Sequence, residues 1–166
     1  MITLGINAAF HDSAAALVRD GVLLAAAEEE RFSRVKHGKR PLPFSTWELP
    51  FNAIDYCLQE AGITLAEVDH VGYSYDPSRF LKERELGDSL RLPLHPSAST
   101  AAQDGWDNPW DPLFIAYILN AKGQLVDGAP HHLRARFAGV THDGPFKFHH
   151  VDHHLCHQAS AFLASP

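Results

Sequence analysis

The sequence predicts an α/β domain, because three strand-like segments come first and helical patterns then alternate with further strands. Residues 2–7, 14–18 and 22–28 are short apolar runs, and Asp20-Gly21 is the two-residue signal of a β-hairpin. Residues 49–61 carry apolar side chains at helical spacing. We therefore expect an antiparallel meander of three strands, followed by helices alternating with further strands.

The composition is that of a soluble globular domain and excludes several classes of protein. The 166 residues are 45% hydrophobic and 20% charged, and no apolar run approaches the length of a membrane span. The N-terminus lacks a charged segment followed by a long apolar core, so we expect a cytoplasmic location and no membrane partner. The net charge of −6 argues against nucleic acid as a partner. Cys57 and Cys156 form no CxxC pair, and we expect reduced thiols.

Residues 8–13 predict a turn between the first two strands, and this turn carries the titratable pair His11 and Asp12. Asp12 could orient a ligand, and His11 could act as a general base near neutral pH. Asp12 and Ser13 are also ordinary turn-forming residues, so a purely structural role stays open.

The segment after the third strand changes from acidic to basic. Glu28, Glu29 and Glu30 are followed by the cations Arg31, Arg34, Lys36, Lys39 and Arg40, with His37 among them. The basic side chains could bind a phosphorylated small molecule, but a solvated loop is the simpler interpretation. For the acidic residues, Arg31 and Lys36, a structural role ranks ahead of contact with phosphate.

The middle of the chain predicts one well-defined helix and a less regular region. Ser45 or Thr46 is expected to cap the helix, with Glu48 or Leu49 inside its first turn, and Gly62 is expected to end it. Residues 68–75 predict a strand. The region 76–146 predicts a loop-rich insertion with short helices over 78–86, 112–121 and 131–137.

Near the C-terminus, a strand over 146–151 leads into a histidine-rich helix. If Asp152 is the N-cap, His153 and His157 lie one turn apart on one helix face, a spacing that suits two ligands of one metal ion. Such a cluster could equally be a solvated turn or an adventitious metal binder. Cys156 could be a soft third ligand, although a buried structural thiol is favoured. We expect Ala159, Ala161, Phe162 and Leu163 to give the helix a packing surface.

Taken together, the two ends of the chain resemble the N-terminal part of the NodU/CmcH family of O-carbamoyltransferases. The similarity spans residues 2–75 and 147–163, and the region 76–146 matches only loosely. The segments that carry it are Leu4-Gly5-Ile6-Asn7, Phe10-His11-Asp12-Ser13-Ala14-Ala15-Ala16-Leu17-Val18, Asp20-Gly21, the run AAEEERFSRVKH from Ala26 to His37, and the run HHLCHQASAF from His153 to Phe162.

The resemblance implies an actin-like ATPase fold (ASKHA, ribonuclease H-like), shared with the Kae1-like threonylcarbamoyl transferases. Members use ATP and carbamoyl phosphate to form carbamoyl adenylate, and then transfer the carbamoyl group to a hydroxyl of a small molecule. By the family pattern, His153 and His157 are ligands of a divalent metal, usually Fe²⁺. His11 and Asp12 match the turn that lines the carbamoyl-transfer site, with His11 as the candidate base for the acceptor hydroxyl.

The resemblance implies a length of several hundred residues for a complete family member, whereas this sequence has 166 residues. We therefore expect residues 1–166 to be an N-terminal lobe, with the C-terminal lobe, the YrdC-like domain and the remaining metal ligands supplied elsewhere. Little turnover is expected from this chain alone, and a completing polypeptide is a candidate partner. The alternatives are an inactive or partner-completed metal- or phosphate-binding fragment, and a Kae1-like enzyme that acts on tRNA.

Overall fold

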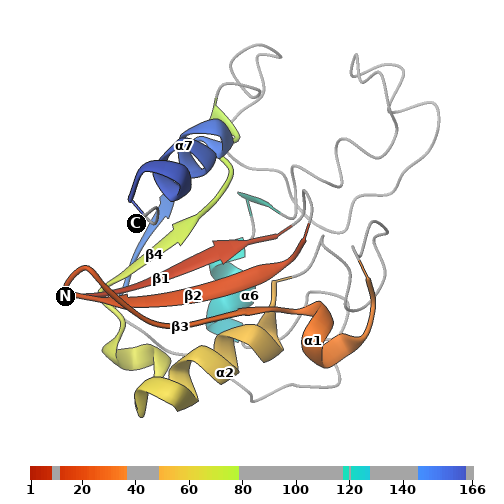
Figure 1. Cartoon of the computed structure of the whole chain (residues 1–166), viewed down its shortest axis with the longest axis vertical. Helices are drawn as coiled ribbons and strands as arrows, with labels where there is room; N and C mark the ends of the chain where they lie inside the picture. The colour runs from red at the N-terminus through yellow and green to blue at the C-terminus, as the bar shows by residue number, and fades with distance from the viewer. Residues whose placement is uncertain (9–11, 37–48, 79–117, 120, 128–145, 164–166) are drawn as a thin grey trace.

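The computed structural model describes residues 1–8, 12–36, 49–78, 118–119, 121–127 and 146–163. The predicted helices over 78–86 and 131–137 and the cap residues Ser45 and Thr46 lie outside these ranges, apart from Ser78. The elements, drawn in Figure 1, are β1 (Ile2–Asn7), β2 (Ala14–Arg19), β3 (Val22–Glu28), α1 (Glu30–Ser33), α2 (Phe51–Ala61), the short 3₁₀ helix η1 (Leu65–Glu67), β4 (His70–Tyr73), α6 (Ala121–Asp127), β5 (Lys147–His150) and α7 (His153–Leu163).

The described strands form one five-stranded sheet in the order β3-β2-β1-β4-β5. The pairs β1–β2 and β2–β3 are antiparallel, and β4 and β5 are added parallel to β1. Asp20 and Gly21 both have positive φ, at 50° and 84°, as a tight hairpin turn requires. The predicted meander and the α/β class are thus confirmed.

Alternating side chains of the strands build the core on one face of the sheet. Leu4, Leu17 and Val71 are fully buried, and the hydroxyl of buried Tyr73 donates to the carbonyl oxygen of Ala8 at 3.0 Å. The helix α2 packs against β2 and β3 on this side, and α7 lies on the other side of the sheet (Figure 1). The two faces of the sheet therefore differ, since one is closed by core packing.

The beginning of α2 differs from the prediction. The helix starts at Phe51 rather than directly after Ser45 or Thr46, and Pro50 occupies the N-cap position without a side-chain cap. Instead, the Glu29 carboxylate accepts from the backbone N–H of Ala53 at 2.9 Å and from the amide of Asn52 at 2.5 Å. A residue 24 positions earlier in the chain therefore satisfies a free N–H at the helix start. Gly62 ends the helix with φ 65°, as predicted.

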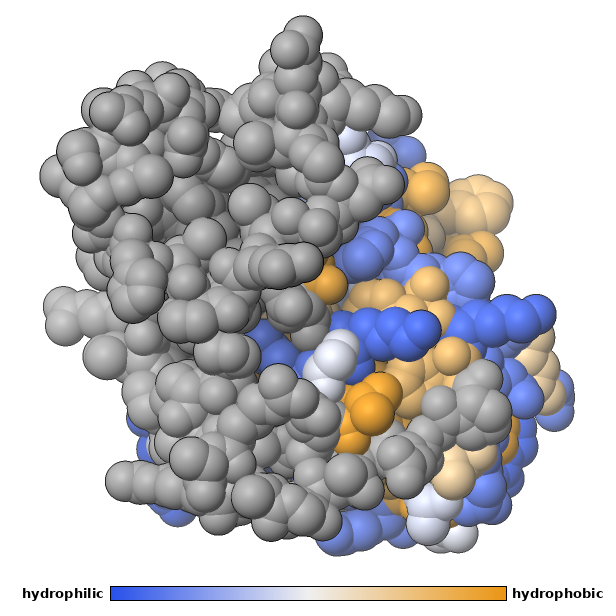
Figure 2. Space-filling view, turned by 180° about the vertical axis from the view of Figure 1, so that it is seen from behind, coloured by the Kyte–Doolittle hydropathy of each residue, from blue (hydrophilic) through white to orange (hydrophobic). Residues whose placement is uncertain are grey.

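One other boundary shifts, and one packing expectation is wrong. The strand predicted over 68–75 is confined to β4. Most of the helix predicted over 112–121 lies outside the described residues, and the described helix α6 runs from Ala121 to Asp127. Phe162 and Leu163 in α7 are 83% and 77% exposed, so they do not pack within the described part of the chain. Figure 2 shows that hydrophobic residues come to the surface among hydrophilic ones. None of the described helices is long and apolar enough to cross a membrane.

Candidate functional site

The first turn of α7 brings the two predicted metal ligands together. The Asp152 carboxylate accepts from the backbone N–H of Leu155 at 3.0 Å, which confirms Asp152 as the helix N-cap. The Nε2 atoms of His153 and His157 lie 3.0 Å apart, and their rings meet edge to face with centroids 4.5 Å apart. The two imidazoles therefore share one helix face, as the spacing predicted.

A backbone carbonyl orients the first of these imidazoles. Nδ1 of His153 lies 3.0 Å from the carbonyl oxygen of Ser74, just beyond the end of β4. If Nδ1 carries the proton and donates it to this oxygen, the lone pair of the ring is on Nε2, which faces His157. Two such nitrogens, each about 2.1 Å from one ion, would subtend roughly a right angle at it. The pair thus fits a shared metal ion, with a second group that fixes the tautomer.

Two histidines are an incomplete metal site, and the described residues contain no group of three or more potential ligands among His, Cys, Asp and Glu. Cys156 is half-buried, and burial, with a further contribution from Asp152, raises the pKa of its thiol. This partial burial is consistent with the structural thiol favoured by the sequence.

The turn after β1 lies at the same end of the sheet. Asp12 is exposed and has φ 38°, and its carbonyl oxygen accepts from the Asn7 side-chain amide at 2.9 Å. The Asn7 amide oxygen in turn accepts from the Ser74 hydroxyl. His11 lies outside the described residues. Asn7 therefore connects the Asp12 turn to Ser74, and Ser74 contacts His153.

Sequence analysis did not single out Asn7 or Ser74. A weak signal was present, because Asn7 ends β1 and Ser74 follows β4, and in α/β sheets ligands bind beyond the carboxyl ends of parallel strands. The parallel pairing of β1 with β4 could not be predicted from the sequence, since 62 residues lie between the end of β1 at Asn7 and the start of β4 at His70. The local pattern alone gave no reason to place the two side chains together.

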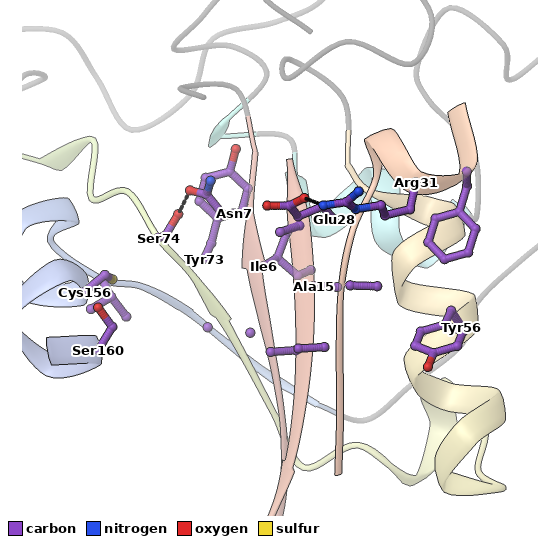
Figure 3. Close-up of a pocket in the computed structure, with 18 residues that line it drawn as sticks. Ile6, Asn7, Ala15, Glu28, Arg31, Tyr56, Tyr73, Ser74, Cys156 and Ser160 are labelled. Carbon is purple, nitrogen blue, oxygen red and sulfur yellow. Dashed lines mark hydrogen bonds and ion pairs between the residues drawn. The ribbon is translucent and has the colours of Figure 1, made fainter. Parts of the chain in front are cut away.

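A cavity of about 930 Å³ lies beside this end of the sheet (Figure 3). Cys156 and Ser160 on α7 border it on one side, and Arg31 and Tyr56 border it on the other. The residues that line it come from the four strands β1 to β4, from the three helices α1, α2 and α7, and from the ends of strands, namely Gly5, Ile6, Asn7, Ala14, Ala15, Ala16, Ala26, Ala27, Glu28, Arg31, Phe32, Tyr56, Gly72, Tyr73, Ser74, Val151, Cys156 and Ser160.

The acidic and basic residues after β3 divide into different roles. Glu29 is 4% exposed and holds α2, which supports the structural role expected for it. Burial raises the pKa of its carboxyl group, although the hydrogen bonds from Ala53 and Asn52 oppose that shift. Glu28 pairs with Arg31 at 3.1 Å at the edge of the large cavity. Arg34 and Lys36 are exposed and line a smaller cavity with Glu30 and Arg31.

Comparison with known proteins identifies one family. Residues 2–83 match the model of the carbamoyltransferase N-terminus. The chain is 45% identical over 162 residues to the nodulation protein NolNO of Sinorhizobium fredii, covering 96% of this chain and 18% of NolNO. It is 38% identical over 165 residues to the uncharacterized protein sll1178 of Synechocystis, covering 98% of this chain and 23% of that protein. An uncharacterized 19.2 kDa protein of Rhizobium etli is 42% identical over 67 residues, which are 40% of this chain and 34% of that protein. The chain therefore spans less than a quarter of the length of NolNO and of sll1178.

Proposed function

The chain belongs to the carbamoyltransferases through its N-terminal domain, residues 2–83, and we propose that it forms the N-terminal part of an O-carbamoyltransferase. The substrates would be ATP, carbamoyl phosphate and a small hydroxylated acceptor. The observation that carries the proposal is that the His153–His157 pair and the Asp12 turn meet at one end of the sheet, through Ser74 and Asn7. Chemistry on a phosphorylated intermediate needs a cation site and an acceptor site close together.

The sheet supports an actin-like ATPase lobe as the fold of this part. Three antiparallel strands at one side, continued by strands parallel to β1, are the arrangement expected for such a lobe. In a fold of this kind the nucleotide would lie beyond the carboxyl ends of β1 and β4, where Asn7 and Ser74 stand.

His153 and His157 would hold a divalent metal, for which Fe²⁺ is our proposal because neutral imidazole is a suitable ligand for it. When bound, the ion would offset negative charge on the phosphate oxygens. The part of His153 is to keep Nε2 directed at His157, and the Ser74 carbonyl oxygen holds that orientation. Further ligands would come from outside the described residues or from a completing polypeptide.

The transfer step would use the turn that Asn7 holds. The acceptor oxygen would attack the carbamoyl carbon of carbamoyl adenylate, the bond from that carbon to the phosphate oxygen would break, and AMP would leave. A base takes the proton of the acceptor hydroxyl, and His11 is the proposed base. The contact from Asn7 to the Asp12 carbonyl oxygen would fix the turn that carries His11.

A Kae1-like enzyme acting on tRNA is the second candidate, and the net charge of −6 disfavours it because a tRNA surface calls for basic residues. The two can be separated by mass spectrometry. The chain, and a longer polypeptide that contains it, are incubated with ATP, labelled carbamoyl phosphate, Fe²⁺ and a small alcohol, and in a parallel reaction with threonylcarbamoyl adenylate, Fe²⁺ and tRNA. Formation of carbamoyl adenylate and of a carbamate ester on a small alcohol supports the proposal. A threonylcarbamoyl group on tRNA, or no adenylate from either polypeptide, contradicts it.

A further inference from the structure

The floor of the large cavity is a flat row of the smallest residues. Ala26 of β3 pairs with Ala16 of β2, Ala16 pairs with Gly5 of β1, and Gly5 pairs with Gly72 of β4. All four line the cavity. A Cβ atom added at Gly72 would meet no atom within 4 Å. Packing within the described residues therefore does not require glycine there, and any larger side chain would project toward the cavity.

The two sides of the cavity differ in their lining residues. Phe32 and Tyr56 stand on one side, with ring centroids 5.9 Å apart, and are 42% and 37% exposed. Cys156 and Ser160 of α7 stand on the other side (Figure 3). Exposed aromatic side chains at the border of a cavity with an apolar floor favour a ligand with a flat or aliphatic body.

The charge of the lining argues against an anionic or cationic ligand body. Glu28 and Arg31 are the charged residues among those that line this cavity, and they pair with each other at 3.1 Å. Their charges therefore offset one another. By contrast, Arg34 and Lys36 border a separate, smaller cavity.

One end of the cavity is polar and lies next to the histidine pair. Asn7 and Ser74 line the cavity there, and the carbonyl oxygen of Ser74 lies 3.0 Å from Nδ1 of His153. A ligand whose apolar body covers the floor would place a polar end group at Asn7 and Ser74. That is the end where the transfer chemistry was proposed.

We propose that this cavity is the acceptor pocket, and that the acceptor is a neutral hydroxyl compound with an aromatic or aliphatic body rather than a charged or fully polar polyol. The assignment of the bound compound as the acceptor rests on the proposed carbamoyltransferase function. The binding of such a compound to the cavity does not depend on that function. The volume of about 930 Å³ suits a small molecule, since ligand pockets span roughly 300–1,000 Å³.

The direct test is saturation-transfer NMR on the chain with phenyl β-D-glucopyranoside, compared with methyl β-D-glucopyranoside. The two probes share their hydroxyl groups and differ in the apolar part. We expect saturation of the phenyl protons, and markedly weaker binding of the methyl compound. Equal binding of both probes, or no binding of the phenyl compound, would overturn the inference.

Substitutions on the floor place the binding in this cavity. Gly72→Val should weaken binding of the phenyl compound at least about tenfold, because the added side chain occupies the cavity. A β-branched residue also suits a strand, so the fold should persist. Ala26→Val, at an exposed position of β3, is the second variant should Gly72→Val fail to fold. Gly123→Ala on α6 is the matched control, since it also adds a Cβ in open space but lies outside the lining. A loss in Gly123→Ala as large as in the floor variants would contradict the placement.

The failure of this inference and the failure of the proposed function have different signatures. Carbamoyl adenylate formation in the wild-type longer polypeptide tests the function without any acceptor. Phenyl glucoside binding tests the cavity without ATP. If Gly72→Val weakens the binding of adenosine rather than the binding of the glucoside, the cavity is a nucleoside pocket and the acceptor assignment is wrong.

Discussion

The Nδ1 atom of His153 lies 3.0 Å from the carbonyl oxygen of Ser74, which ties the first turn of α7 to the end of β4. These residues are 79 positions apart in the sequence. Because Ser74 also bonds to Asn7, and Asn7 to Asp12, the histidine pair is mechanically connected to the turn between β1 and β2.

Replacing either His153 or His157 with Ala should remove most Fe²⁺ binding, because one imidazole alone cannot chelate. We expect an affinity loss of at least about tenfold in each variant. His154→Ala is the matched control, since His154 is exposed and adjacent in sequence but is not part of the 3.0 Å Nε2 contact. Isothermal titration with Fe²⁺ under anaerobic conditions measures the three affinities. Equal losses in all three variants would show that the ligand face is assigned wrongly.

Asn7→Ala should destabilise the chain, because it removes a donor to the Asp12 carbonyl oxygen and an acceptor for the Ser74 hydroxyl. The loss should be about 1–3 kcal/mol in the free energy of unfolding, measured by urea denaturation. Ser74→Ala serves as a control, since it deletes the hydroxyl but keeps the carbonyl oxygen that His153 contacts. It should cost less stability than Asn7→Ala and should leave Fe²⁺ affinity within about twofold. A larger loss in Ser74→Ala would mean that Asn7 is not the connecting residue.

Much of this fold, but only part of the site, could be predicted from the sequence. Local signals decide the hairpin at Asp20-Gly21, the stop at Gly62 and the cap at Asp152, and all three were predicted correctly. Each depends on a backbone conformation or hydrogen bond within a few residues. The same holds for the proximity of His153 and His157, which lie one helical turn apart.

The features that sequence analysis missed depend on contacts between distant segments. Glu29 caps α2 across 24 positions, whereas its neighbour Glu28 has the same side chain and pairs with Arg31. The contact between Ser74 and Asn7 needs the parallel pairing of β1 and β4. A run of three glutamates or a lone serine carries no local sign of such a partner. These contacts arise from tertiary packing, which leaves no periodic pattern in the sequence at these positions.

The buried Glu29 carboxyl group predicts how stability depends on pH. Burial raises its pKa above the ordinary value of 4.5, so the folded chain binds the proton more tightly than the unfolded chain. The contribution of this group to stability is therefore fully present below pH 4.5 and is lost as the pH rises through the raised pKa. Urea denaturation between about pH 4 and pH 7 should reveal the decline, and Glu29→Gln should flatten it. Glu60→Gln, at an exposed position of α2, is the control and should leave the pH profile as in the wild type.

Two leucines of opposite exposure test where the core of the described chain lies. Leu17 of β2 is fully buried between α2 and the sheet neighbours, whereas Leu163 at the end of α7 is 77% exposed. Leu17→Ala should lower the free energy of unfolding by about 2–5 kcal/mol, because it removes buried methyl groups and leaves a cavity. Leu163→Ala makes the same chemical change and should cost within about 0.5 kcal/mol. Thermal and urea denaturation of both variants gives the comparison. A comparable loss in Leu163→Ala would mean that α7 packs its apolar end against another surface in solution, and the exposed face would then belong to a folded interface.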